Sequence, residues 1–300
     1  MVQQNKKPLL LIFPDYQEAG IRLSEASQLP YKMVKIHHFP DGESRIELPE
    51  SLPQHVILCQ TLNHPNEKLI ELILTAETAR RLGAIHVTLV APYLCYMRQD
   101  KAFHTGESIS QLIIGKFIKD YFNAVITVDP HLHRVHTLEQ AIPAQQSIAL
   151  SATRPIKQYI TQHHSSPFLI GPDIESEQWV ASIAKSGGFD YTVASKQRTG
   201  DRKVEVALPE INIKNRDVIL IDDIASSGQT LISITNKLIT QSPASITAIV
   251  THALFEDRTI KEMRKAGINQ IVSTDSVIHN TNKIHLAQLL AEAIHTISYH

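Results

Sequence analysis

VILIDDIASSGQTLIS, residues 218–233, is the stretch of sequence that decides the fold. Four apolar residues lead into Asp222 and Asp223, small and hydroxylated residues follow, and apolar residues then recur with helical spacing. In open α/β sheets, ligands bind beyond the carboxyl ends of the strands. The stretch therefore predicts a buried strand over 217–223, a turn that carries binding groups, and a helix over 230–241.

The small residues after the two aspartates are suited to binding a phosphate group. They are Ser226, Ser227, Gly228, Gln229 and Thr230. Backbone N–H groups in such a turn can approach a phosphate closely, and the start of a helix adds partial positive charge. Carboxylates cannot bind phosphate themselves, but they accept hydrogen bonds from a sugar diol or hold Mg²⁺. The pattern indicates a sugar-phosphate site, and an ordinary helix cap beside a strand-end aspartate stays open as the alternative.

The same alternation of apolar runs and amphipathic stretches extends along the whole chain. Strands are predicted over 9–13, 56–60, 86–94, 124–129, 168–173, 191–195, 217–223, 246–255 and 270–275. Helices are predicted over 66–83, 108–122, 176–188, 230–241 and 284–297. Continuous apolar runs indicate strands covered on both faces, as in parallel sheets. Because the series restarts near residue 148, the sequence predicts an α/β fold with two similar domains, 1–147 and 148–300.

Composition limits the class of protein. The 300 residues suffice for two domains, and 43% of them are hydrophobic, which is enough for a sizeable core. A net charge of −1 argues against nucleic-acid binding through a broad basic surface. The apolar run near the N-terminus is too short for a signal peptide core, and no segment approaches membrane-spanning length. Cys59 and Cys95 are predicted to be buried free thiols, which favours a reducing compartment. Together, charge, hydropathy and cysteine content predict a cytoplasmic protein without membrane or nucleic-acid partners.

Four other segments gather chemically active residues, and each also has a simpler interpretation. FPDGE, residues 39–43, reads as a turn. APYLCYMRQDK, residues 91–101, ends in a cationic and polar fork suited to polyphosphate, or in a solvated charged loop. DPHLHR, residues 129–134, combines an aspartate with two histidines, which is a weak metal-binding pattern. KQR, residues 196–198, begins either a mobile basic loop or an exposed basic turn.

Together and in this order, the segments resemble the ribose-phosphate pyrophosphokinase family. The resemblance covers nearly the whole chain and includes FPDGE, APYLCYMRQDK, TVDPHLHR, GPD, SKQR and VILIDDIASSGQT. Phosphoribosyltransferases that act on nucleobases share the last motif but lack the pair FPDGE and RQDK. The resemblance implies a ribose-phosphate diphosphokinase, which transfers the pyrophosphoryl group of Mg-ATP to the C1 hydroxyl of ribose 5-phosphate. The products would be phosphoribosyl diphosphate (PRPP) and AMP.

The resemblance also implies how the chain is organised. It implies two tandem phosphoribosyltransferase-like domains, each with a mostly parallel central sheet flanked by helices. ATP would belong to the side of residues 1–147, and ribose 5-phosphate to the side of residues 148–300. The active site would be shared between the subunits of a homo-oligomer.

Roles for single residues follow from the same resemblance. The ribose hydroxyls and 5-phosphate would be bound by Asp222, Asp223, Ser226, Ser227, Gly228, Gln229 and Thr230. ATP would be bound by Phe39, Asp41, Glu43, Arg98 and Gln99, of which the first three would reach the adenine held by the adjacent subunit. Lys196 and Arg198 would be catalytic residues on a flexible loop, and Mg²⁺ would be bound by His131 and Asp173.

Departures from the family pattern leave a second function open. IESEQWV, residues 174–180, stands where many members have a glycine pair, and Ser226 stands where many have aspartate. The alternative is a non-catalytic homologue that binds nucleotide or PRPP and regulates a partner enzyme. The intact basic pair Lys196 and Arg198 favours the enzyme, because a pure binding protein need not retain a mobile cationic loop.

Overall fold

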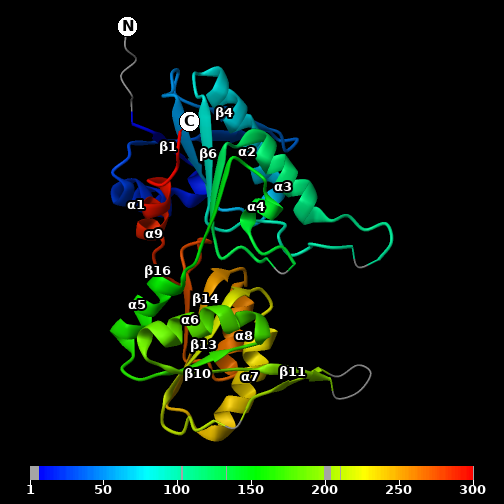
Figure 1. Cartoon of the computed structure of the whole chain (residues 1–300), viewed down its shortest axis with the longest axis vertical. Coiled ribbons are helices and arrows are strands. Elements are labelled where there is room, and N and C mark those ends of the chain that lie inside the picture. The colour runs from blue at the N-terminus through cyan, green and yellow to red at the C-terminus, as the bar shows by residue number, and fades with distance from the viewer. Residues whose placement is uncertain (1–6, 103, 133, 199–203, 210, 300) are drawn as a thin grey trace. The chain divides into compact units, whose positions relative to one another are not determined.

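The computed structural model describes residues 7–102, 104–132, 134–198, 204–209 and 211–299, with 196–198 and 204–206 described by their backbone alone. The chain divides into two compact units, which are shown in Figure 1. Unit 1 comprises residues 1–151 and 286–300, and unit 2 comprises residues 152–285.

Unit 1 is built on a six-stranded parallel sheet with the strand order β2-β1-β5-β6-β7-β8. Its strands are β1 Leu9–Ile12, β2 Tyr31–Met33, β5 His55–Cys59, β6 His86–Ala91, β7 Ala124–Val128 and β8 Gln146–Leu150. Its helices are α1 Gln17–Ser27, α2 Pro65–Arg81, α3 Ser110–Tyr121, α4 Leu138–Ala141 and α9 Ala287–Ile294. Figure 1 shows α1 and α9 on one face of the sheet and α2, α3 and α4 on the other. Strands β3 Lys35–His38 and β4 Ser44–Glu47 form a separate antiparallel hairpin.

Unit 2 repeats this architecture with the strand order β10-β9-β13-β14-β15-β16. Its strands are β9 Phe168–Gly171, β10 Asp190–Val193, β13 Asp217–Ala225, β14 Ser245–Ala253, β15 Gln270–Thr274 and β16 Asn282–Ile284. Its helices are α5 Thr153–His163, α6 Glu177–Gly187, α7 Gln229–Leu238 and α8 Asp257–Lys265. Strands β11 Ser195–Arg198 and β12 Val204–Ala207 form a second separate hairpin.

The central strands are buried on both faces, as their continuous apolar sequences predict. Every residue of β6 and of β7 is buried, as are the apolar residues of β14 and those of β13 except Ile224, which is partly exposed. Burying one Val, Leu or Ile side chain contributes about 1.5–3 kcal/mol, so each sheet stabilises its unit through these strands. The prediction of an α/β fold with two parallel-sheet domains is confirmed.

Among the differences from the sequence prediction, two bear on the site and on the two units. Strand β13 does not end at Asp223 but runs to Ala225, because it stays paired with β14 up to Ala225 and Ala253. The last helix, α9, belongs to unit 1 and not to the unit that precedes it in the chain.

The C-terminal segment is held to unit 1 by packing and by hydrogen bonds. Helix α9 lies against α1, from the other end of the chain (Figure 1), and against β8. The side chain of Gln146 in β8 donates to the Ser298 carbonyl at 2.7 Å and accepts from its N–H at 2.9 Å. A single division between residues 147 and 148 therefore does not describe the units, because it cuts β8 and leaves this return of the chain out.

Within the described part of the chain, no helix has the length and apolar character needed to cross a membrane. Both cysteines, Cys59 and Cys95, are buried free thiols as predicted. Burial raises the pKa of Cys95 to about 12, so its thiol stays protonated at neutral pH.

Candidate active site

The carboxyl ends of β9 and β13 bring three aspartates to one edge of the sheet in unit 2. The two strands are neighbours and run parallel, with Leu220 opposite Ile170. Asp222 and Asp223 lie near the end of β13, and Asp173 follows β9 by two residues. The predicted pair and the predicted metal ligand of this unit therefore share one edge, where ligands bind in open α/β sheets.

The two adjacent aspartates of β13, Asp222 and Asp223, are fixed by the backbone around them. The Asp223 N–H donates to Asp222 Oδ1 at 3.1 Å, and the Ile224 N–H donates to Asp223 Oδ1 at 2.8 Å. Burial raises the pKa of Asp222 well above its ordinary value, and the nearby charges of Asp223 and Asp173 raise it further. The edge therefore gathers carboxyl groups whose ionised forms a cation or hydroxyl donors would stabilise.

Asp173 is oriented by a cap that the sequence analysis did not identify. Its Oδ1 accepts a hydrogen bond from the Ser176 N–H at 3.3 Å, and its own N–H donates to Ser176 Oγ at 3.3 Å. This reciprocal cap begins a short 3₁₀ turn, Ile174–Ser176, that leads into α6. A Cβ on Gly171 would lie 2.5 Å from Ser176 Oγ, so glycine is needed there for the serine to fit. The divergent segment 174–180 thus contains the residue that orients Asp173.

The turn after β13 forms the start of α7, as the motif predicts. Gly228 caps the helix with a left-handed backbone, φ 67°. A Cβ at this position would lie 2.8 Å from Thr259 Cγ2, so the position favours glycine for two independent reasons. Ser226 and Ser227 are exposed, and Ser227 Oγ accepts from the Gln229 N–H at 3.5 Å. The helix N-terminus behind them favours an anion.

The predicted catalytic residues lie on the separate hairpin of unit 2. Lys196 and Arg198 are in β11, opposite Val206 and Val204 of β12. Their side chains, and residues 199–203, lie outside the described part of the chain. The hairpin pairs with neither six-stranded sheet in the described residues. The structure therefore places the backbone of Lys196 and Arg198 on a separate two-stranded hairpin of unit 2.

In unit 1, Arg98 and Gln99 follow β6 at the carboxyl edge of the sheet. The Arg98 side chain is exposed, and Gln99 is fixed against α3 because its Oε1 accepts from Ser110 Oγ at 2.9 Å. The neighbouring Asp100 accepts from the Arg134 N–H at 3.2 Å and forms an ion pair with the Arg134 side chain at 3.5 Å. This pair joins the Arg98 segment to the segment after β7 that carries His131.

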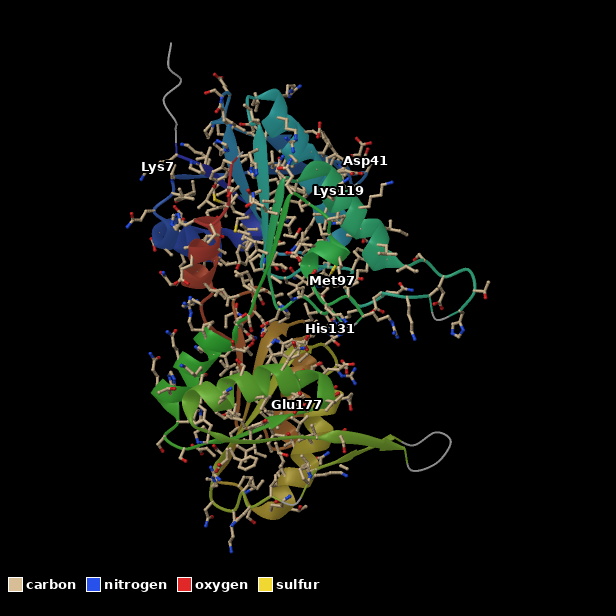
Figure 2. The ribbon with its side chains drawn as sticks, viewed as in Figure 1. Lys7, Asp41, Met97, Lys119, His131 and Glu177 are labelled. Atoms are coloured by element: carbon tan, nitrogen blue, oxygen red, sulfur yellow. The ribbon has the colours of Figure 1, made fainter. Side chains whose placement is uncertain are left out.

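The predicted adenine-binding residues Phe39, Asp41 and Glu43 lie in the turn between β3 and β4. All three are exposed, and 40% of Phe39 is accessible. Figure 2 shows Asp41 well away from Met97 and His131 of the same unit. The structure therefore does not bring the turn to the Arg98 segment within one unit.

The two predicted metal ligands belong to different units, His131 to unit 1 and Asp173 to unit 2. His131 is partly buried on the segment after β7, two residues beyond Asp129, which has a left-handed backbone with φ 37°. Among the residues that the structure describes, no three His, Cys, Asp or Glu side chains are grouped to hold a metal ion. A metal bound at either residue would need further oxygen ligands.

Three polar residues that support the predicted segments were not selected from the sequence. They are Ser176, Asp100 and Glu71. Asp100 lies inside the quoted RQDK segment, but its bond to Arg134 joins parts of the chain that are far apart in sequence. Glu71 could have been found, because it is an acidic residue on the buried stripe of α2 beside Leu72 and Thr75.

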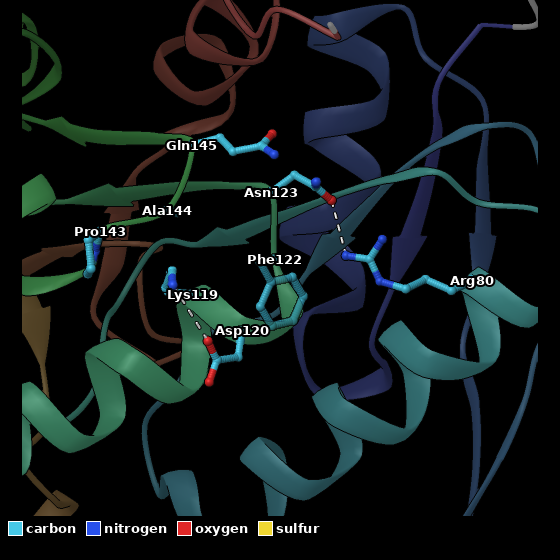
Figure 3. Close-up of a pocket in the computed structure, with 8 residues that line it drawn as sticks. All are labelled: Arg80, Lys119, Asp120, Phe122, Asn123, Pro143, Ala144 and Gln145. Carbon is cyan, nitrogen blue, oxygen red and sulfur yellow. Dashed lines mark hydrogen bonds and ion pairs between the residues drawn. The ribbon is translucent and has the colours of Figure 1, made fainter.

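A pocket of about 280 Å³ in unit 1 contains none of the predicted site residues (Figure 3). It is lined by Arg80, Lys119, Asp120, Phe122, Asn123, Pro143, Ala144 and Gln145. Apart from Arg80, which is on α2, these residues precede β7 and β8, so the pocket lies at the amino ends of these strands. Its arginine is already bonded: Arg80 donates to the Tyr121 carbonyl at 3.0 Å and to Asn123 Oδ1 at 3.1 Å. The pocket is therefore separate from the carboxyl edge and its arginine has a structural role.

Comparison with known proteins covers almost the full length of the chain. Residues 14–121 match the family model of the N-terminal domain of ribose phosphate pyrophosphokinase, and residues 140–287 match the phosphoribosyl transferase domain. The ribose-phosphate pyrophosphokinase of Methanopyrus kandleri is 30% identical over 283 residues, which cover 93% of this chain and 96% of the relative. The ribose-phosphate pyrophosphokinase of Saccharolobus solfataricus is 33% identical over 279 residues, covering 87% and 90%.

The fold also matches a solved structure. The crystal structure of phosphoribosylpyrophosphate synthetase from Mycobacterium smegmatis gives a TM-score of 0.82 at 20% identity. The match covers 97% of this chain and 98% of the other. At 20% identity this structural similarity establishes the fold alone. Membership of the family is shown by the more similar sequence relatives.

Proposed function

The chain belongs to the ribose-phosphate pyrophosphokinase family, and we propose that it transfers the pyrophosphoryl group of ATP to the C1 hydroxyl of ribose 5-phosphate, giving PRPP and AMP. The observation that carries the proposal is the edge of unit 2, where Asp222 and Asp223 are followed directly by the glycine-capped start of α7. Acceptors for sugar hydroxyls thus adjoin amide donors for a phosphate.

Ribose 5-phosphate would bind along this edge. The carboxylates of Asp222 and Asp223 would accept hydrogen bonds from the ribose hydroxyls. The backbone and hydroxyl groups of Ser226, Ser227, Gly228, Gln229 and Thr230 would bind the 5-phosphate at the N-terminus of α7. The left-handed conformation of Gly228 supports this role, because it lets the loop turn directly into the helix.

ATP would be bound mainly by unit 1. The exposed guanidinium of Arg98 would pair with its phosphates, and Gln99, already fixed by Ser110, would stand beside it. The turn with Phe39, Asp41 and Glu43 would contact the adenine held by an adjacent subunit. Its separation from Met97 and His131 in Figure 2 supports a homo-oligomer with shared active sites.

Magnesium fits the acidic edge of unit 2. Asp173 and Asp222 offer hard carboxylate oxygens. Burial raises the pKa of Asp222, the charges of Asp223 and Asp173 raise it further, and a divalent cation would relieve that repulsion. His131 would be the ligand from unit 1. Mg²⁺ keeps several substrate oxygens and waters in its coordination shell, so few protein ligands are needed. When bound with ATP, it would supply charge neutralisation of the triphosphate.

In the transfer step, the C1 oxygen of ribose forms a bond to the β-phosphorus of ATP. The bond from that phosphorus to the bridging oxygen of the α-phosphate breaks, AMP leaves with that oxygen, and the hydroxyl proton is released. Lys196 and Arg198 would stabilise the negative charge that develops on the phosphate oxygens. Electrostatic groups of this kind are worth roughly a hundredfold or more in rate.

The proposal is tested by following ATP with and without ribose 5-phosphate in the presence of Mg²⁺. We expect AMP to form only when ribose 5-phosphate is present, together with an equal amount of PRPP. Formation of ADP instead would mean transfer of a single phosphoryl group and would contradict the proposal. Absence of any turnover would favour the non-catalytic homologue, and consumption of PRPP with a nucleobase would indicate a nucleobase transferase.

The cellular compartment is part of the proposal as well. The two buried free thiols support a reducing compartment such as the cytoplasm, because neither cysteine is used in a disulfide.

A further inference from the structure

The β3–β4 hairpin needs side chains to fix it to unit 1. In the described part of the chain, β3 and β4 pair only with each other and add no strand to the six-stranded sheet. Ile36 and Ile46 pack against the core cluster of the unit from the middle of the hairpin. The turn at its end, Phe39–Glu43, is exposed, and among the described residues none from this turn packs against that cluster.

The conformation of that turn is set by its own hydrogen bonds. The Phe39 N–H donates to the Glu43 carbonyl at 2.8 Å, and the Gly42 N–H donates to the Phe39 carbonyl at 2.9 Å. The Glu43 N–H donates to Asp41 Oδ1 at 3.2 Å, and Gly42 has a left-handed backbone, φ 92°. Hydrogen bonds within the turn therefore set its shape. Its position relative to unit 1 must be set by contacts of residues outside the turn.

One buried carboxylate fixes both ends of the turn. Glu71 Oε1 accepts from His38 Nε2 at 2.8 Å and from Ser44 Oγ at 3.2 Å. His38 and Ser44 are opposite each other in the hairpin, immediately before and after Phe39–Glu43. The Glu71 side chain, on α2, is only 6% exposed. Because a buried carboxylate is costly unless it is bonded, this contact holds the hairpin at a defined place on α2.

The placement also shapes the surface beside the turn. Gly42, Glu43 and Ser44 form one wall of a cavity of about 530 Å³, and α2 forms the other with its exposed Ile70 and Leu74. If the turn moved relative to α2, this cavity would change and the groups at its rim would be displaced.

We propose that Glu71 is a positioning residue for nucleotide binding, which acts through His38 and Ser44 to hold the Phe39–Glu43 turn. The inference rests on the proposed function, because the turn is assigned to adenine only there. A positioning residue of this kind changes the affinity for ATP and leaves the reacting groups of unit 2 in place.

The test compares steady-state kinetics of Glu71→Ala with a control on the same helix, Glu77→Ala, whose side chain is exposed. We expect Glu71→Ala to raise the KM for ATP roughly tenfold, as loss of hydrogen bonds to a charged group does. The kcat and the KM for ribose 5-phosphate should stay within about twofold, since the reacting groups are untouched. The control should leave all three constants unchanged. Glu71→Gln keeps an acceptor oxygen and should restore most of the affinity.

A second variant separates positioning from folding. Ser44→Ala removes one of the two donors and should raise the KM for ATP about two- to threefold without altering the melting temperature by more than about 2 °C. In Glu71→Ala the additional Ser44→Ala change should then have no further effect, because its partner is already absent.

An unchanged KM for ATP in Glu71→Ala would overturn the inference, as would equal losses in kcat and in both KM values. If Glu71→Ala does not fold, an unchanged KM in Ser44→Ala would overturn it instead. Failure of the proposed function is distinguishable, since the unaltered protein would then form no AMP with ribose 5-phosphate.

Discussion

The buried, acidic surroundings of Asp222 disfavour its ionised form, so an ionised Asp222 destabilises the fold. Its pKa is raised by burial and then by the charges of Asp223 and Asp173. At neutral pH the folded protein must hold this carboxylate ionised against both effects or keep it protonated. Asp217, at the other end of the same strand, has the opposite character: hydrogen bonds from Ser245 and His164 lower its pKa.

We expect Asp222→Asn to raise the melting temperature at pH 7 by roughly 2 °C or more while abolishing turnover. A raised pKa destabilises the fold above the ordinary pKa of about 3.9, and the penalty vanishes below it, where both states are protonated. The gain should therefore shrink as pH falls toward 4. Thermal unfolding from pH 4 to pH 8 measures this.

Asp217→Asn is the matched control, because the lowered pKa of Asp217 stabilises the fold above its ordinary pKa. It should lower the melting temperature at pH 7 and have less effect as the pH falls. If both variants shifted the melting temperature at pH 7 in the same direction, this account of the acidic edge would be contradicted.

Gly228 gives a second prediction at the residue scale. Gly228→Ala places a Cβ at a left-handed position and 2.8 Å from Thr259 Cγ2, so both backbone strain and a clash oppose it. Gly188→Ala, with φ 71° and open space around it, carries the strain alone. We expect Gly188→Ala to cost about 1 kcal/mol of unfolding free energy and Gly228→Ala about 1–3 kcal/mol more.

The same pair separates stability from binding. Binding of ribose 5-phosphate, measured by calorimetry, should weaken in Gly228→Ala and stay unchanged in Gly188→Ala. Equal affinities in the two variants would argue against a phosphate loop at the start of α7.

Sequence patterns select candidate site residues where the segments that carry them are adjacent in the chain. They miss supporting residues whose partners are distant in sequence or depend on an unpredicted turn. The aspartate pair and Gly228 were predicted because strand, turn and helix follow one another within sixteen residues of sequence. Ser176 lies only three residues from Asp173, but its role as a cap depends on a 3₁₀ turn that the helix prediction over 176–188 did not include. Glu71 lies on α2, and its partners His38 and Ser44 are on a hairpin about thirty residues away.

At the scale of elements, β13 differs from its prediction for a reason that lies in its neighbour. An apolar run ends at Ile221, so the pattern predicts that the strand stops with the aspartates. The ladder with β14 continues to Ala225, and Asp222 and Asp223 are thus held inside a paired strand. Pairing partners are set by tertiary contacts, which a single sequence does not encode in its periodicity.

The β11–β12 hairpin gives a prediction for an element. Lys196→Ala should lower kcat roughly a hundredfold or more, because its ammonium would stabilise charge that develops only in the transition state. The dissociation constant of ATP should stay within about threefold, since the proposed ground-state contacts of ATP are residues of unit 1. Lys185→Ala, an exposed lysine on α6, is the control and should change neither value. Unaltered turnover in Lys196→Ala would remove the assigned role.

Helix α9 gives a second prediction at this scale. Leu290 is 1% exposed on the face that turns toward the unit, so Leu290→Ala should lower the unfolding free energy by about 2–5 kcal/mol. Hydrogen exchange should accelerate in α1, against which α9 packs, and remain unchanged in β13 and β14 of unit 2.

Gln288→Ala, on the exposed side of α9, serves as the control and should stay within about 0.5 kcal/mol of the unaltered protein. Faster exchange in unit 2 rather than in α1 would contradict the assignment of α9 to unit 1.

For the whole molecule, one strand–helix pattern used twice accounts for most of the architecture. Continuous apolar runs predicted both parallel sheets, and the restart of the series predicted two domains. The pattern did not predict that residues 286–300 return to unit 1, because an amphipathic helix can cover either sheet. That choice depends on contacts such as those of Gln146 with Ser298.

The central claim is that the edge of β13 is a sugar-phosphate site, and a crystal structure with ribose 5-phosphate and Mg²⁺ tests it most directly. We expect the ribose hydroxyls within hydrogen-bond distance of Asp222 and Asp223, and the 5-phosphate at the backbone of Ser226–Thr230. Ribose 5-phosphate bound elsewhere, with this loop still open to solvent, would contradict the claim.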